Sequence, residues 1–285
     1  MVGGDDPGAR PEVPPRPPAP TTEPVTEEPD VEPAPAVVLT TSVAYGPESQ
    51  QFAEVHRRSD IERGPAVVLV HGGCWNSGSV ERWDETVQVL ADDGYVVWAA
   101  SYRYHDGEGR WQTQPEDIAR LVARVRADAH VDPDRIVIGG DSSGGHLALL
   151  HAYRHRDVAG VLSLSGVIDP EAWLAAGSGI SHCFPPFAGG WPEEAPPGRY
   201  EELSPLRAVS PGVPPTAVVA SLADPITRFP SQSGALLAAL DDVGAPSTAI
   251  VVDECPGNEH VDHGTRLLVC TLPDIRAWLA ALLRP

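Results

Sequence analysis

The chain contains no lysine, since all 20 of its basic residues are arginine, and it has no long apolar run. The first absence excludes a P-loop nucleotide site, which requires a lysine after its last glycine. The second predicts that no segment spans a membrane. Basic residues are also outnumbered by 40 acidic ones, for a formal net charge of −20. Nucleic acids and anionic membrane surfaces are bound through basic patches, so this balance argues against both as partners.

The first 36 residues differ in composition from the rest. Pro, Glu, Asp and Thr dominate positions 5–35. Such a segment has too little apolar surface to offset the entropy of ordering it, so we predict a disordered tail over 1–36. The remainder, 37–285, is long enough for one sizeable catalytic domain.

The start of the chain gives two expectations for localisation. Met1–Asp5 has neither the basic nor the apolar region of a signal peptide, which favours the cytoplasm. The acidic Pro/Thr tail instead resembles the spacer of a secreted protein or lipoprotein. If a leader preceded this sequence and was removed, we expect an extracellular or lipid-anchored protein.

The most informative stretch is Gly140–His146 (GDSSGGH), which places Ser142 inside a Gly-x-Ser-x-Gly motif. The β-branched run 135–138 before it is typical of a buried strand, and leucines recur at helical spacing after it. A serine at such a strand-to-helix turn is a nucleophile elbow. The alternative is a glycine-rich phosphate-binding turn, but this stretch lacks Gly-x-Gly-x-x-Gly. We therefore predict Ser142 as a catalytic nucleophile.

A nucleophilic serine needs a base and an acid that orients the base. With this type of elbow the chain order is Ser, then Asp or Glu, then His. Asp224 and His260 each follow a short apolar run that predicts a strand. We predict that His260 takes the proton of Ser142 and that Asp224 orients His260. His263, three residues further on, is the alternative base.

Other residues near these positions have weaker claims. Asp253 and Glu254 end the last predicted strand and could orient a histidine, but strand-exit charges are usually solvated. His146 opens the helix behind the nucleophile, where we expect a packed or capping side chain.

The oxyanion donors are predicted from 67–75, an apolar run that leads into His-Gly-Gly. Glycines have no side chain, so backbone N–H groups beside them can approach a substrate oxygen. We predict donors at Gly73 and Cys74, together with the N–H of Ser143, which follows the nucleophile.

In combination these segments resemble an α/β-hydrolase of the esterase/lipase type. The sequence resembles the hormone-sensitive-lipase-like and kynurenine-formamidase-like groups. It most resembles bacterial carboxylesterases with His-Gly-Gly-x-Trp. The resemblance covers roughly 37–285. Cys74 stands where many relatives have a third glycine, which favours the His-Gly-Gly-x-Trp branch. The matching segments are His71–Trp75, Ser101–Tyr104, Gly140–His146, Asp224 and Pro256–His260.

The expected fold is α/β, a mostly parallel eight-stranded sheet with helices on both faces. A small insertion after the sixth strand, 169–211, would form a lid or pocket wall, or only pack on the domain. Trp75, Trp111 and Trp191 are predicted to line the substrate pocket. Strands are expected near 37–45, 51–57, 66–71, 95–101, 135–140, 158–165, 215–221 and 248–254, and helices near 80–93, 115–129, 143–155, 231–243 and 272–283.

The four cysteines are even in number and lack the Cys-x-x-Cys spacing of metal ligands. We hypothesise two disulfides, Cys255 with Cys270 and Cys74 with Cys183. Four free thiols in a cytosolic enzyme are the alternative.

The predicted function is hydrolysis of small to medium carboxylic esters through an acyl-enzyme intermediate. The substrate is thus a small-molecule ester, and neither a metal nor another cofactor is implied. One alternative is an amide-directed hydrolase, arylformamidase-like or exopeptidase-like. The other is a non-catalytic binding protein on a hydrolase scaffold.

Overall fold

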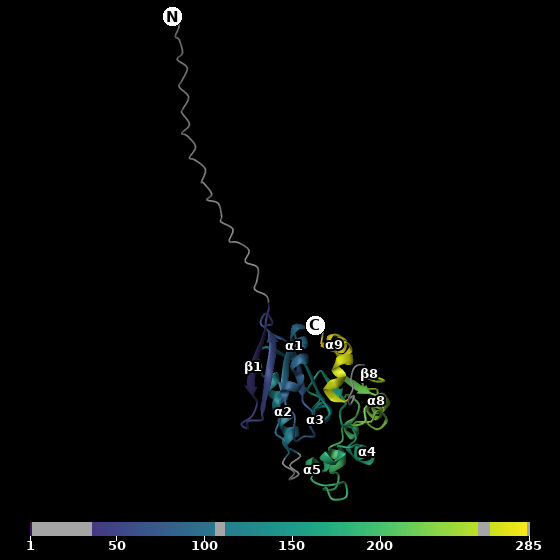
Figure 1. The fold of residues 1–285 in the computed structure, drawn as a ribbon. Coiled ribbons are helices and arrows are strands. Elements are labelled where there is room, and N and C mark those ends of the chain that lie inside the picture. Colours follow the sequence, from purple (N-terminus) through teal and green to yellow (C-terminus); the bar gives the residue numbers. More distant parts are fainter. Residues whose placement is uncertain (2–35, 106–111, 256–262, 284–285) are drawn as a thin grey trace. The chain divides into compact units, whose positions relative to one another are not determined.

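The structure is a computed structural model that describes Met1 and residues 36–105, 112–255 and 263–283. The chain divides into a short N-terminal unit, Met1–Pro35, and a compact unit, Ala36–Pro285. The compact unit is built on one eight-stranded sheet covered by helices, which confirms the expected α/β-hydrolase fold (Figure 1).

The sheet has the spatial order β1-β2-β4-β3-β5-β6-β7-β8. The pairs β1–β2 and β2–β4 are antiparallel, and every later pair is parallel. Strands with parallel neighbours end at the same edge, so the loops that follow them can meet there. The strands are β1 (Val38–Ala44), β2 (Phe52–Arg58), β3 (Gly64–Val70), β4 (Val96–Ala100), β5 (Val131–Asp141), β6 (Gly160–Leu164), β7 (Thr216–Ser221) and β8 (Ser247–Val252).

Helices cover both faces because both faces of the central strands are apolar. In β3, Val68 and Val70 belong to one hydrophobic cluster, whereas Val67 and Leu69 belong to the other. Side chains alternate along a strand, so each cluster lies on its own side of the sheet. The first cluster includes residues of α2 (Thr113–Arg126), α3 (Ser143–His155) and α8 (Ser233–Asp242), and the second includes residues of α1 (Asp84–Asp92) and α9 (Leu268–Leu283).

The insertion between β6 and β7 consists of short helices, α4 (Pro170–Ala175), α5 (Phe184–Ala188), α6 (Arg199–Glu202) and α7 (Pro205–Ala208). Two of them begin with a proline behind a capping side chain: Asp169 accepts N–H bonds at the start of α4, and Ser204 does so at α7. Trp173, Phe184 and Phe187 are buried in the first cluster. These three aromatics therefore pack the insertion onto the domain.

Several element boundaries differ from the expected ones. Strand β5 begins at Val131, not near 135, and helix α9 begins at Leu268, not near 272. Proline is most favourable in the first turn of a helix, yet Pro273 lies inside α9.

In the described part of the chain, no helix is both long and apolar enough to cross a bilayer.

Candidate active site

Ser142 lies on the tight turn between β5 and α3 that the motif predicts. Its backbone has φ 53° and ψ −119°, which is unusual for a residue other than glycine. The turn is fixed by the N–H of Ser142, which donates to Leu164 O at 2.9 Å. A Cβ on Gly144 would lie only 2.1 Å from Val70 O, and one on Gly140 would lie 2.5 Å from the same atom. The two motif glycines are thus needed for close packing of strand and helix.

The predicted oxyanion turn, which we define as residues 72–75 and call the oxyanion turn, lies beside the predicted nucleophile, Ser142. A Cβ on Gly72 would fall 3.0 Å from the Cβ of Ser142. Left-handed backbone follows, with φ 130° at Gly73, 54° at Cys74 and 58° at Trp75. No described residue accepts a backbone hydrogen bond from the N–H of Gly73 or Cys74. These N–H groups and that of Ser143, in the first turn of α3, are the donors predicted for the oxyanion.

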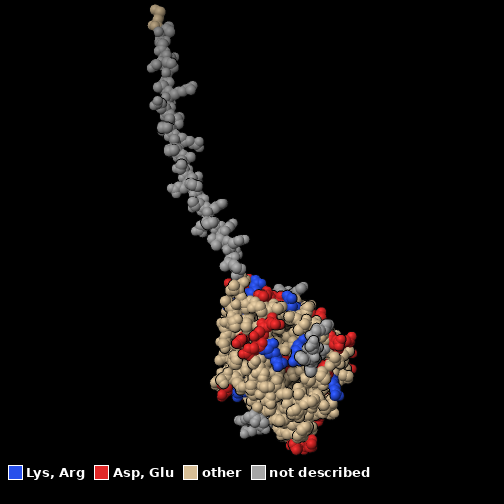
Figure 2. Space-filling model, viewed as in Figure 1, with Lys and Arg blue, Asp and Glu red and all other residues tan. Residues whose placement is uncertain are grey.

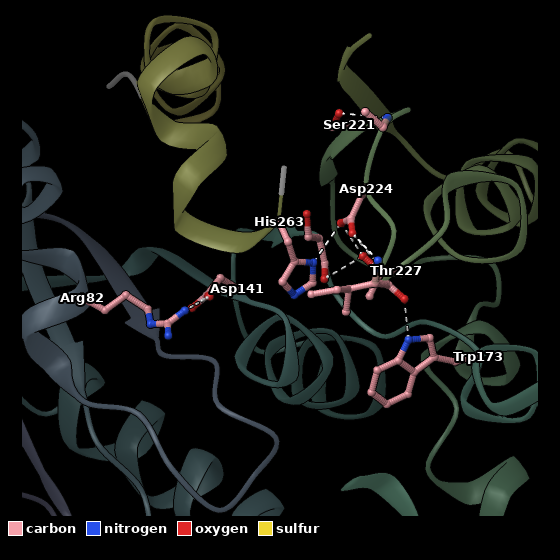
Figure 3. A network of polar contacts seen from close by, with 10 residues as sticks. Arg82, Asp141, Trp173, Ser221, Asp224, Thr227 and His263 are labelled. Carbon is pink, nitrogen blue, oxygen red and sulfur yellow. Dashed lines mark hydrogen bonds and ion pairs between the residues drawn. The ribbon is translucent and has the colours of Figure 1, made fainter. Parts of the chain in front are cut away.

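Asp224 follows β7 and is held by several donors (Figure 3). Its Oδ1 accepts the N–H groups of Ile226 and Thr227 at 2.8 and 3.1 Å, and its Oδ2 accepts the hydroxyl of Thr227 at 2.8 Å. Oδ2 also lies 2.8 Å from Nδ1 of His263. Burial acts to raise the pKa of Asp224, but the bonds from His263, Thr227 and Ile226 outweigh it and lower that pKa. Asp224 is therefore an oriented, ionised carboxylate at neutral pH.

His263 is the histidine that contacts Asp224. Because the ionised Asp224 can only accept, Nδ1 of His263 donates to it, and Nε2 is the ring nitrogen left for other partners. Nε2 is buried and makes no hydrogen bond to the described residues. The predicted base, His260, lies outside the described residues. The histidine weighed as its alternative thus occupies the position beside the acid.

The segment that carries His263 packs against the nucleophile turn. A Cβ on Gly264, at φ 62°, would lie 2.6 Å from Oδ2 of Asp141. Asp141 directly precedes Ser142, so the backbone at Gly264 lies against the side chain of the residue before the predicted nucleophile.

Sequence reasoning missed the part that Asp141 plays. Its side chain is fully buried and accepts the Gly72 N–H at 2.6 Å and Arg82 Nη1 at 2.7 Å. Arg82 comes from the 3₁₀ helix η1 (Val80–Trp83), and Figure 3 shows its ion pair with Asp141. Together with the Gly72 bond, this carboxylate links η1 and the oxyanion turn to the residue before Ser142. The available signal was an acidic residue at the end of an apolar strand.

His146 is a buried structural residue, as expected. Its Nε2 donates to Leu203 O at 2.7 Å, and its Nδ1 accepts the indole N–H of Trp75 at 3.2 Å. Burial lowers the pKa of His146 to about 3. The ring is therefore neutral and connects α3, the oxyanion turn and the insertion.

The three tryptophans predicted for the pocket have different positions. Trp75 has no exposed surface and stacks on Phe187 with ring centroids 5.1 Å apart, so a packing role replaces the expected pocket-lining role. Its direction follows from the left-handed turn, which aims the side chain into the core. Trp191, on the insertion, is 44% exposed. Trp111 lies outside the described residues.

Both hypothesised disulfides are present. Cys74 pairs with Cys183 across a Cα–Cα distance of 5.7 Å, and Cys255 pairs with Cys270 across 5.9 Å. The first joins the oxyanion turn to the insertion. The second joins two cysteines that lie on either side of His263 in the sequence.

A polar cavity of about 370 Å³ opens beside His263. In Figure 2, arginine side chains lie at the hollow in the visible face of the molecule. Over the ranges that the structure describes, no group of three or more His, Cys, Asp or Glu is placed to hold a metal ion. The cavity is lined by Gly78, Ser79, Arg82, His263, Thr265 and Arg266.

The sequence matches the model of one protein family, BD-FAE, over residues 56–240. It is also similar to Esterase LipQ of Mycobacterium tuberculosis, with 28% identity over 242 residues that cover 78% of this chain and 56% of LipQ. Esterase LipC of the same organism is 33% identical over 121 residues, 40% of this chain and 30% of LipC. The chain thus spans little more than half the length of these curated relatives, or less.

Among solved structures, esterase B of Lactobacillus rhamnosis has a similar fold. The TM-score is 0.71 and the identity 19%, with 88% of this chain and 87% of the esterase covered. At that identity the likeness supports the fold.

Proposed function

Since the chain belongs to the BD-FAE family, we propose that it is a carboxylic ester hydrolase that works through a covalent acyl-enzyme. One observation carries this proposal: Oδ2 of Asp224 lies 2.8 Å from Nδ1 of His263, in the domain that holds Ser142 at a positive φ on the turn between β5 and α3. The names of the relatives LipQ and LipC, both esterases, support the same reaction class.

In the proposed first step, Nε2 of His263 accepts the proton of the Ser142 hydroxyl as the oxygen attacks the ester carbonyl. Asp224 keeps the ring in the tautomer with hydrogen on Nδ1 and stabilises the positive charge that the ring acquires. The negative charge on the carbonyl oxygen is stabilised by the N–H groups of Gly73, Cys74 and Ser143.

Collapse of the tetrahedral intermediate then breaks the ester bond. The protonated ring gives its proton to the departing alcohol, and the acyl group stays on Ser142. In the second step the same ring removes a proton from water, which attacks the acyl-enzyme and releases the acid. The ring passes this second proton to the Ser142 oxygen as the acid departs, so the second step restores the Ser142 hydroxyl. His263 gains and loses one proton in each step.

We assign the base to His263 instead of His260 because His263 makes the 2.8 Å contact with Asp224. The Asp141–Gly264 contact supports this assignment, since it brings the chain beside His263 to the nucleophile turn. An amide-directed hydrolase would use the same groups, so the substrate decides between the two readings.

The test is hydrolysis of p-nitrophenyl esters of increasing acyl length by the wild type and by Ser142→Ala. Ser210→Ala is a matched control, because its hydroxyl bonds Arg156 away from the site. We expect turnover of short or medium esters by wild type and control, and background rates for Ser142→Ala. Inactivity of the wild type toward every ester, with turnover of aryl formamides or peptides, would favour an amide-directed enzyme. Inactivity toward all of them would favour a binding protein.

A further inference from the structure

The oxyanion turn contains two consecutive left-handed residues that are not glycine. Cys74 and Trp75 have φ 54° and 58°. Side chains with a Cβ adopt this conformation at a cost in free energy, so it persists only where the surroundings enforce it. One of the two, Cys74, carries an N–H that the proposed function assigns to the oxyanion. The contacts that enforce this conformation therefore bear on the rate of the reaction.

The left-handed conformation of Trp75 is enforced by non-covalent contacts. Its ring stacks on Phe187 and meets Phe184 edge-on, both with centroids 5.1 Å apart. Its indole N–H bonds His146, and its carbonyl oxygen accepts the N–H of His105 at 3.0 Å. These partners lie on the insertion, on α3 and on the segment after β4.

The turn that contains Cys74 is closed by the Gly73 carbonyl, which accepts the N–H groups of Asn76 and Ser77 at 3.1 and 3.0 Å, and Cys74 has a covalent restraint in addition. Cys74 is only partly buried, and the residues after Trp75, 76–79, are exposed. Its side chain is bonded covalently to Cys183, the last residue of the 3₁₀ helix η2 (Ser181–Cys183). Cys183 directly precedes Phe184, so the disulfide and the aromatic contacts reach the turn from the same piece of the insertion.

We propose that the Cys74–Cys183 disulfide is a positioning element of the oxyanion hole, so that Cys183, far along the chain, sets the catalytic rate. The proposal rests on the esterase function proposed above. While the disulfide is intact, Cys74 stays left-handed and its N–H stays directed at the oxyanion position. When the disulfide is opened, Cys74 relaxes toward negative φ and this donor is lost.

The disulfide can be opened by a dithiol such as dithiothreitol. One thiolate of the reagent attacks a sulfur of the pair and breaks the S–S bond, and its second thiol then resolves the mixed disulfide. The protein gains two electrons and two protons as the thiols of Cys74 and Cys183. The reagent is oxidised to its cyclic disulfide.

The first experiment compares Cys183→Ala with wild type in kcat, in KM and in affinity for a trifluoromethyl ketone, which forms a tetrahedral adduct on the serine. Loss of one oxyanion donor lowers kcat by about 10² to 10³, so relaxation of the turn should lower kcat by about tenfold to a hundredfold. We expect the affinity for the ketone to fall by a similar factor and KM to change little. A merely structural role would leave both kcat and ketone affinity unchanged in the folded variant.

Cys270→Ala is the matched control, because it opens the other disulfide and keeps Cys74–Cys183. Added dithiothreitol should lower the ketone affinity of wild type and of Cys270→Ala, and leave that of Cys183→Ala as it was. If Cys183→Ala does not fold, as judged by near-ultraviolet circular dichroism, the dithiothreitol titration of Cys270→Ala decides, because Cys74–Cys183 is the disulfide left to open in that variant. Reoxidation should then restore both affinity and rate.

The proposal is overturned if folded Cys183→Ala, or fully reduced wild type, keeps its kcat and its ketone affinity. In that outcome, loss of turnover in Ser142→Ala would leave the proposed function intact. Failure of the wild type to hydrolyse any ester would instead refute the proposed function itself.

Discussion

The oxyanion turn and the Asp224–His263 pair are the two loop-borne parts of the proposed site, and different forces hold them. The turn is held by a disulfide, an aromatic stack and a neutral histidine, His146. The pair is held by hydrogen bonds to one ionised carboxylate. Covalent and packing contacts fix the N–H donors, which need not move during the reaction. Hydrogen bonds instead suit a group that must gain and lose a proton at each step.

The largest expected effect comes from removing the histidine of the Asp224–His263 pair. Loss of a triad base costs up to about 10⁶ in kcat, so His263→Ala should reduce ester turnover nearly to background. His260→Ala is the matched variant, and we expect it to lose less than about tenfold. Steady-state kinetics on a p-nitrophenyl ester distinguishes them. The reverse order of effects would return the role of base to His260.

The next effect removes the charge and keeps the shape. Asp224→Asn should lower kcat by about 10⁴, because an amide cannot hold His263 in the required tautomer or stabilise its charged form. Thr227→Val, which removes one hydroxyl donor to the same carboxylate, should have a much smaller effect. Comparable losses in the two variants would contradict the orienting role of Asp224.

Low pH should change the free energy of unfolding differently through His146, which holds the oxyanion turn, and through Asp224. His146 has a folded-state pKa of about 3 against an ordinary value of 6.5, so its neutral burial costs nothing above 6.5 and becomes unfavourable as pH falls from 6.5 toward 3. The full loss is on the order of 5 kcal/mol in the free energy of unfolding. Asp224 has a lowered pKa, so its contribution is present above its unfolded value and is lost only as pH falls through the folded one.

Urea unfolding of wild type and His146→Gln at pH 7, 6, 5 and 4 measures this effect. We expect the wild type to lose stability over that range and the variant to lose less, since glutamine does not titrate. Parallel curves for the two proteins would show that His146 is not the group responsible.

The smallest expected effect concerns Asp141, which links the oxyanion turn to η1. Arg82→Gln removes the charged partner, and Asp141→Asn weakens the bond to the Gly72 N–H. Because misplacement by about 1 Å can cost about 10² in rate, we expect losses of tenfold to a hundredfold, larger for Asp141→Asn. Arg276→Gln, whose partner Asp93 is exposed, serves as control in the same assay. Equal rates in all three variants would exclude Asp141 as a link.

The fold was largely predictable from the sequence, because hydrophobic periodicity and glycine spacing act locally. The elbow at Ser142, the insertion after β6 and both disulfides were anticipated. Which histidine contacts Asp224 was left between His260 and His263, because the two lie three residues apart in the sequence and the contact depends on tertiary packing. The direction of Trp75 likewise depends on a left-handed turn that a cysteine gives no reason to expect.

The central claim is that Ser142 becomes covalently acylated, and intact-mass spectrometry after treatment with a fluorophosphonate tests it most directly. We predict one phosphonyl adduct per chain, mapped to the peptide that contains Ser142, and no adduct on Ser142→Ala. An unmodified wild type, or an adduct on any other residue, would contradict the serine hydrolase mechanism.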